Sequence, residues 1–234
     1  MINNWILLGP ANAKKTEIVI SALIDNPIIR TKPFVLMCET DTGCAVELAI
    51  KHKIEIHIVD DIKLKSPKVI EMLKSLQADV LISCGWSYKI PVEHNIYFKY
   101  PIINCHGSVL PDYKGKRAYL HQWANIEGFY GATIHTISDK FDQGEIIIQG
   151  KQKLFLKENL IMIHRRLSEL TAQLIPQALL MIDYNLPTQN NYMKKNSQSR
   201  YFYNIKKRKL VLHRLINRFA YYFNLKKWST PHKM

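Results

Sequence analysis

Acidic residues are absent from the last part of this sequence, because none follows Asp183. The 234 residues include 33 Lys and Arg against 19 Asp and Glu, and twelve of the 33 cations lie in residues 184–234. The first 183 residues therefore carry 21 basic and 19 acidic side chains and are nearly neutral. A basic surface indicates an anionic partner. That indication applies to the extension, residues 184–234, and not to the body, residues 1–183, for which nucleic acid is not the expected partner.

Long apolar runs and clustered metal ligands are also absent. No eighteen consecutive residues are apolar, and no basic region precedes the first apolar run. These absences predict a cytoplasmic protein. The four cysteines form no C-x-x-C pair and the nine histidines show no H-E-x-x-H spacing, so we expect reduced thiols and no metal.

Short apolar runs alternate with stretches of helical spacing, which predicts parallel strands joined by right-handed crossovers. We predict an α/β fold with a doubly wound, Rossmann-like, mostly parallel sheet over the body and a short C-terminal extension. Such sheets bind ligands at the carboxyl ends of their strands. The predicted strands are 5–8, 34–37, 54–59, 80–83, 102–104, 132–137 and 146–149. The predicted helices are 16–23, 44–52, 67–76, 119–125 and 160–182, and residues 185–199 are predicted to form a loop.

The segment I-I-N-C-H-G-S-V-L-P-D-Y-K-G, residues 102–115, places Asn104 and His106 two positions apart at the end of a predicted strand. Alternate strand residues share a face, so both side chains can point into one crevice. An amide and an imidazole can donate to a developing oxyanion, and the imidazole can also move protons. On spacing alone, a structural role is the more common one for such a pair.

A second segment, G-A-T-I-H-T-I-S-D-K-F-D-Q-G-E-I-I-I-Q, covers residues 131–149. Together the two segments resemble the folate-dependent formyltransferases, the group that contains glycinamide ribonucleotide, methionyl-tRNA and sugar-nucleotide formyltransferases. The resemblance extends over about residues 5–180. The matching positions are Asn104, His106, Leu110, Pro111, Lys114, Gly115, Gly131, Thr133, Ile134, Asp142 and Gly144.

The resemblance implies 10-formyltetrahydrofolate as the formyl donor. It also implies that Asn104 and His106 hold the oxyanion of a tetrahedral intermediate, while Asp142 orients His106 and relays the proton that leaves the substrate amine. Acyl transfer to an amine needs an oxyanion donor, a proton acceptor and a held geometry. These three residues satisfy that requirement without a metal or a protein nucleophile.

The segment C-G-W-S-Y-K-I-P, residues 84–91, resembles the family loop that lines the pterin pocket. The alternative for its aromatic residues is a plain strand-to-helix turn. The candidate folate-binding residues are Gly85, Trp86, Tyr88, Ile90, Ile137 and Asp139. The candidate substrate-binding residues are Lys114, Lys116 and Arg117, for which the alternative is solvated loop cations. His135, a lone strand histidine, is expected to be structural.

The acceptor amine is inferred by elimination. The loop G-P-A-N-A-K-K, residues 9–15, lacks the second glycine and the Ser-Asn pair with which the purine-pathway enzymes cradle phosphate. The extension is too short for the C-terminal domain of the tRNA enzymes. We therefore expect a nucleotide-diphosphate amino sugar used for surface polysaccharide, including lipopolysaccharide. The alternatives are glycinamide ribonucleotide, methionyl-tRNA, or a non-catalytic binding relative.

The extension contains a predicted basic amphipathic helix over residues 206–225. Its apolar positions are Leu212, Leu215, Ile216, Phe219 and Phe223. Three partners remain open for this helix: the body, a second subunit in a homodimer, or an anionic membrane surface, where Trp228 would add an aromatic contact.

Overall fold

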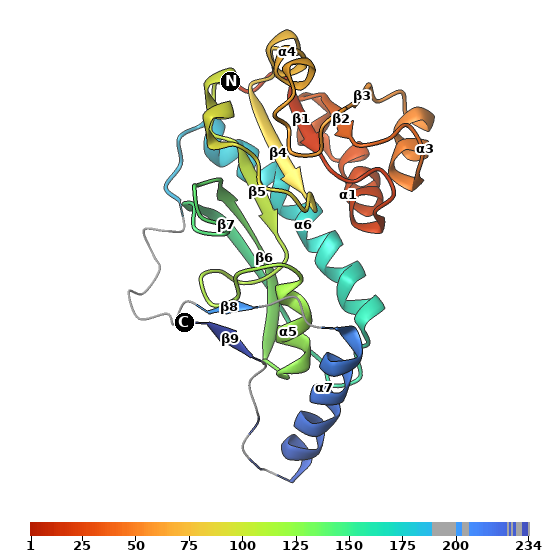
Figure 1. The fold of residues 1–234 in the computed structure, drawn as a ribbon, viewed down its shortest axis with the longest axis vertical. Helices are drawn as coiled ribbons and strands as arrows, with labels where there is room; N and C mark the ends of the chain where they lie inside the picture. Colours follow the sequence, from red (N-terminus) through yellow and green to blue (C-terminus); the bar gives the residue numbers. More distant parts are fainter. Residues whose placement is uncertain (189–199, 203–205, 224, 226, 228–230, 234) are drawn as a thin grey trace.

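The computed structural model describes residues 1–188, 200–202, 206–223, 225, 227 and 231–233, and it forms an α/β fold (Figure 1). Seven strands make one sheet in the order β3-β2-β1-β4-β5-β6-β7. The first five pair in parallel, while β6 and β7 are antiparallel to their neighbours. The strands are β1 (Trp5–Leu8), β2 (Phe34–Cys38), β3 (Ile56–Ile58), β4 (Val80–Cys84), β5 (Ile103–His106), β6 (Phe129–Thr136) and β7 (Ile146–Lys153).

Helices cover both faces of the sheet. Successive residues of the central strands point to opposite faces, so each strand contributes apolar side chains to two cores. In β1, Trp5 and Leu7 belong to the core beneath α1, α3 and α6, whereas Ile6 and Leu8 belong to the core beneath α4. Most side chains of β1, β2 and β4 are buried, as expected for strands covered on both faces. The helices are α1 (Lys14–Ile24), α2 (Pro27–Arg30), α3 (Cys44–Lys51), α4 (Pro67–Ser75), η1 (Val92–Tyr97), α5 (Ala118–Ala124), α6 (Leu160–Asp183) and α7 (Lys207–Tyr222).

The sheet confirms the predicted fold class. Each predicted strand and helix of the body is present, with ends that differ by a few residues. The short helices α2 and η1 were not predicted, because four to six residues are too few to show helical periodicity. Residues 189–199 of the predicted loop, and Trp228, lie outside the described residues.

The extension packs on the body at two places. Residues 200–202 run beside Lys114, whose N–H donates to Arg200 O at 2.9 Å and whose carbonyl accepts from Phe202 N at 2.9 Å. The ring of Phe202 is fully buried and stacks on Tyr113 with a centroid distance of 4.4 Å. Helix α7 packs on α5. A second, two-stranded sheet joins β8 (Tyr201–Phe202) to β9 (His232–Lys233).

Candidate active site

Two loops meet the end of β5 and form a pocket of about 490 Å³. One loop joins β5 to α5, and the other joins β6 to β7. Asn104, His106 and Asp142 all line the pocket, although 38 residues separate the first from the last. The glycine two residues after Asp142 has a steric cause, since a Cβ on Gly144 would lie 1.6 Å from Thr136 O. Only glycine allows the loop that carries Asp142 to return this closely to β6.

The imidazole of His106 lies between two hydrogen-bond acceptors. Its Nε2 is 2.8 Å from Tyr113 O and its Nδ1 is 3.3 Å from Asp142 Oδ1. A backbone carbonyl only accepts, so Nε2 carries a proton and donates it to Tyr113 O. The other carboxylate oxygen of Asp142 accepts from Gly115 N at 2.8 Å. Asp142 therefore links the histidine to the loop between β5 and α5, and it faces the ring nitrogen that does not bond to Tyr113 O.

His135 orients the amide of Asn104. The two residues lie opposite each other on the antiparallel strands β6 and β5. Asn104 Nδ2 lies 3.1 Å from His135 Nε2, and His135 Nδ1 lies 2.8 Å from Thr136 O. Burial, and the nearby His106, lower the pKa of His135 to about 4. The imidazole is therefore neutral at pH 7: Nδ1 donates to Thr136 O, and Nε2 accepts from the amide. An asparagine amide has two N–H bonds, so the second one remains for a ligand.

The candidate folate-binding residues lie mainly at one end of the pocket. Gly85, Trp86, Tyr88, Ile90 and Ile137 line it, whereas Asp139 is exposed and does not. The indole N–H of Trp86 donates to Ile62 O at 3.2 Å, which holds the ring in place. Its ring meets that of Tyr88 edge to face, with centroids 6.1 Å apart. This end thus offers apolar and aromatic surface for a flat ring.

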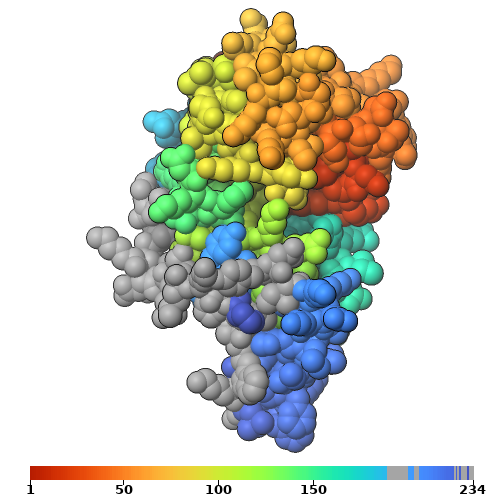
Figure 2. All heavy atoms as spheres, in the orientation of Figure 1, coloured from red at the N-terminus to blue at the C-terminus, as the bar shows by residue number. Residues whose placement is uncertain are grey.

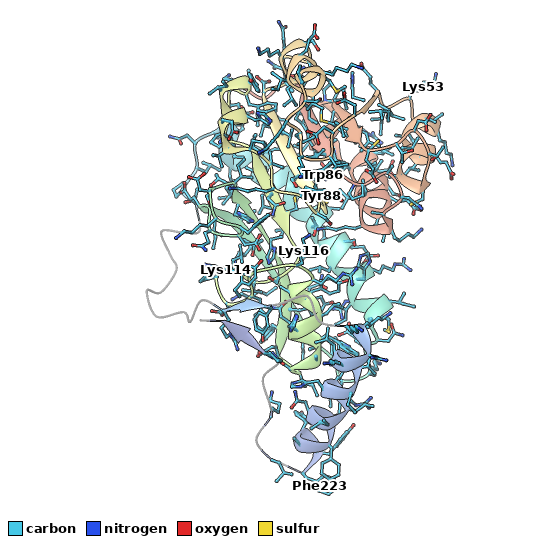
Figure 3. All side chains as sticks on the ribbon, viewed as in Figure 1. Lys53, Trp86, Tyr88, Lys114, Lys116 and Phe223 are labelled. Carbon is cyan, nitrogen blue, oxygen red and sulfur yellow. The ribbon has the colours of Figure 1, made fainter. Side chains whose placement is uncertain are left out.

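Five cations line the pocket, namely Lys15, Lys89, Lys116, Arg117 and Lys140. Lys116 and Arg117 come from the end of the loop between β5 and α5, and Figure 3 labels Lys116 close to Lys114. Lys114, the third candidate, does not line the pocket; it is half-buried, and that burial lowers its pKa. An open groove shares Arg117, Tyr119 and His164 with the pocket. The groove adds Lys14, Arg165 and Lys207 from three helices. It is also lined by Glu17 and Glu169, which pair with Lys14 at 2.8 Å and with Arg165 at 2.9 Å.

Several residues of the site were missed in the sequence. His135 was expected to be structural, but the structure places it in hydrogen-bond contact with Asn104. Lys15, on α1, reaches the pocket and donates from Nζ to Cys105 O at 3.1 Å. Tyr201, in the extension, also lines the pocket. His135 could have been found from strand alternation. It lies on the same face of β6 as Thr133, which is one of the positions that match the family. Nothing local in the sequence points to Lys15 or Tyr201.

The described residues contain neither a cluster of metal ligands nor a helix suited to cross a membrane. No group of three or more His, Cys, Asp or Glu that could hold a metal ion occurs among the described residues. None of the described helices combines the length and apolarity needed to cross a membrane.

Comparison with known proteins assigns the family. Residues 5–179 match the family model described as formyl transferase, and the chain belongs to that family. Methionyl-tRNA formyltransferase of Prochlorococcus marinus (strain MIT 9515) is 26% identical over 177 residues, which are 75% of this chain and 51% of that protein. The Staphylococcus epidermidis (strain ATCC 12228 / FDA PCI 1200) protein of the same name is 34% identical over 134 residues, covering 56% of this chain and 42% of the relative. The chain thus spans about half the length of these curated relatives.

Solved structures confirm the fold. A phosphoribosylglycinamide formyltransferase from Anaplasma phagocytophilum superposes with a TM-score of 0.67 at 17% identity, covering 78% of this chain and 87% of that one. Glycinamide ribonucleotide transformylase 1 from Symbiobacterium toebii gives a TM-score of 0.67 at 18% identity, covering 79% and 89%. The resemblance drawn from residues 102–115 and 131–149 is therefore confirmed at the level of the family and of the fold.

Proposed function

We propose that this chain transfers a formyl group from 10-formyltetrahydrofolate to a primary amine on an acceptor that carries phosphate groups. The observation that carries the proposal is the meeting of Asn104, His106 and Asp142 in one pocket that is also lined by aromatic and cationic side chains. Family membership supports this chemistry.

Asn104 is the proposed oxyanion donor. One of its N–H bonds is directed to His135 Nε2, which fixes the plane of the amide and leaves the other N–H for the formyl oxygen. A donor that is already oriented stabilises a developing negative charge without reorganising during the reaction. The family resemblance implies that His106 holds the oxyanion together with Asn104. Because His106 Nε2 donates to Tyr113 O, we now assign the oxyanion to Asn104 alone.

His106 and Asp142 are the proposed proton relay. The amine nitrogen forms a bond to the formyl carbon, and the bond from that carbon to N10 of the folate breaks. The amine loses one proton in this exchange, and N10 of the folate gains one. His106 Nδ1 and Asp142 Oδ1, 3.3 Å apart, provide adjacent sites through which that proton can pass.

The donor fits the aromatic end of the pocket. Trp86, Tyr88, Ile90 and Ile137 would hold the pterin, and Gly85 lets the backbone approach it because its φ is +83°. The folate supplies an activated formyl group. Asp139 has no part in this proposal, since it lies outside the pocket.

Methionyl-tRNA is the first acceptor to test. The curated relatives named above are methionyl-tRNA formyltransferases. They favour methionyl-tRNA, which the sequence left as an alternative, over the nucleotide amino sugar that we expected from the sequence. The groove beyond the pocket supports a long anionic acceptor through Arg117 and Lys207. Lys14 and Arg165 line the same groove but are paired with Glu17 and Glu169. A terminal aminoacyl group in the pocket would leave the adjoining phosphates facing Arg117 and Lys207.

The loop after β1 argues against glycinamide ribonucleotide. The N–H of Ala11 donates to Glu39 Oε2 at 3.1 Å, so a carboxylate already occupies an amide that would otherwise face a phosphate. A second negative charge beside Glu39 would be repelled.

A nucleotide-linked amino sugar is the second candidate. Tyr201 lines the pocket together with Lys116 and Arg117, and its ring lies beside Gly115. An aromatic ring and two cations in one pocket suit the base and the phosphates of a nucleotide diphosphate.

Initial rates with 10-formyltetrahydrofolate and each of three acceptors test the proposal: methionyl-tRNA, a nucleotide-diphosphate amino sugar and glycinamide ribonucleotide. We expect turnover of methionyl-tRNA or of the amino sugar, and the faster of these two identifies the acceptor. Absence of formyl transfer to all three, in a protein that binds folate, would contradict the proposed activity.

A further inference from the structure

Helix α7 buries two polar side chains against the body and leaves a row of large apolar side chains exposed. The side chains that face the body are Leu210, Arg214, Asn217 and Ala220. On the other side, 44 to 63% of each of five side chains is exposed, namely Leu212, Leu215, Ile216, Phe219 and Phe223. We call these five residues the apolar face of α7. An ordinary surface helix has the reverse arrangement.

The buried face fixes how α7 sits on the body. Arg214 is 3% exposed and donates to Trp123 O and, at 2.8 Å, to Leu156 O. Its guanidinium lies over the Trp123 ring, 4.4 Å from the centroid. Asn217 Nδ2 donates to Ala124 O at 3.0 Å. These directional contacts prevent the helix from rolling to bury its apolar face instead.

The helix projects from the body. Figure 1 shows α7 leaving the sheet at the lower end of the molecule, and Figure 2 shows its second half as a protrusion there. Figure 3 places Phe223 at the far tip. The rings of Phe219 and Phe223 are 4.4 Å apart, so they form one continuous apolar surface. A flat partner can reach this surface without meeting the sheet domain.

The charges around the apolar face select the partner. Arg208 and Lys209 are exposed on α7, and Arg218 is half-buried. The extension contains twelve cations and no acidic residue. A second copy docked through the same face would place like charges together, which is unfavourable. A nucleic acid would satisfy the cations but would leave the aliphatic Leu212, Leu215 and Ile216 in water. A lipid surface with anionic headgroups satisfies both requirements.

We propose that α7 docks the protein on an anionic lipid bilayer, with the apolar face inserted at the level of the headgroups and the cations paired with lipid phosphates. The site for formyl transfer stays on the body and remains open. This docking is separate from the proposed activity and stands or falls independently of it.

Sedimentation with lipid vesicles tests the proposal, using the full chain. One set of vesicles contains equal amounts of phosphatidylcholine and phosphatidylglycerol, and the other contains phosphatidylcholine alone. We expect binding to the first set only. Replacing Arg208 and Lys209 by Gln should weaken that binding roughly tenfold or more, since each cation near an anionic surface contributes about 1 kcal/mol.

The apolar contribution needs a matched pair of variants. Phe219→Glu should abolish sedimentation, whereas Ile96→Glu should leave it unchanged, because Ile96 is 78% exposed on η1, outside the extension. Circular dichroism checks that both variants fold. Equal binding by both variants overturns the proposal, as does wild-type chain that remains in the supernatant. A chain that binds RNA but not vesicles, or that forms a dimer lost in Phe219→Glu without binding vesicles, overturns it as well.

Discussion

The two walls of the pocket differ in how they are built. The body wall consists of Asn104, His106, His135 and Asp142, whose side chains are held by hydrogen bonds within the sheet and its loops. The second wall, which we call the extension wall, consists of Tyr201 from the extension and of the body loop of residues 113–117, which packs against the buried ring of Phe202. The body wall carries the groups that the proposed chemistry needs, and the extension wall is where we propose that the acceptor binds. We therefore expect changes in the body wall to lower turnover and changes in the extension wall to weaken acceptor binding.

The largest effect is expected at Asn104. Asn104→Ala should lower kcat about a hundredfold to a thousandfold, as the loss of one oxyanion donor typically does. The reduction should be the same at every pH, because the amide does not titrate. Asn3→Ala, which changes an exposed asparagine far from the site, is the control. Near-native turnover of folded Asn104→Ala would remove the body wall from the mechanism.

A slightly smaller effect is expected at Asp142. Asp142→Asn keeps the shape of the side chain but removes its charge, so it should lower kcat on the order of a hundredfold, as loss of general acid-base assistance does. Unlike Asn104→Ala, it should also change the pH dependence of kcat. Full pH-rate profiles of both variants with saturating folate separate the two roles. Profiles of identical shape would argue against a proton relay through His106 and Asp142.

His135 has a predicted effect on rate and another on acid stability. His135→Leu removes the acceptor that orients Asn104 and should lower kcat about fivefold, as loss of a hydrogen bond worth about 1 kcal/mol implies. His135→Gln keeps an acceptor and should retain most of the rate. If the leucine variant is as active as wild type, His135 is structural after all.

The pH effect follows from the pKa of His135, which burial lowers from 6.5 to about 4. Between these values the unfolded chain binds a proton that the folded chain does not, so folding stability decreases as pH falls from about 6.5 to about 4. His135→Gln removes this group. Its free energy of unfolding should consequently decrease less over that window than that of wild type, as measured by urea titrations at pH 7 and pH 4.5.

The smallest effect on kcat is expected at the extension wall. Tyr201→Ala should raise the KM for the acceptor about fivefold, which corresponds to about 1 kcal/mol, the lower end of the contribution of stacking on an aromatic ring. The KM for folate should stay constant, and Tyr201→Phe should resemble wild type. A fall in kcat with unchanged acceptor KM would place Tyr201 in the chemistry and break the distinction between the walls.

Local spacing predicted the body well. Each of β1 to β5 is a short apolar run between helical stretches, and this pattern depends only on which faces are buried. The strand end placed Asn104 and His106 on one face, and the resemblance to the formyltransferases singled out these two residues and Asp142. The structure adds the steric reason for glycine at position 144. The folate-binding candidate Asp139 failed to reach the pocket, although it is three residues from Asp142. In a loop, side-chain direction follows no fixed period, so spacing gave no guidance there.

The sequence by itself determined the α/β sheet, the position of the pocket at the end of β5 and the charge asymmetry between body and extension. These features depend on apolar periodicity, strand-end residues and composition. Only the tertiary structure decided that Tyr201 reaches the pocket, that His135 orients Asn104, and that α7 turns Arg214 inward and Phe219 outward. Periodicity identifies an apolar face, but it does not say whether that face meets the body. For α7, the body settled the question, because the carbonyls of Trp123 and Leu156 accept from the Arg214 guanidinium and the carbonyl of Ala124 accepts from Asn217.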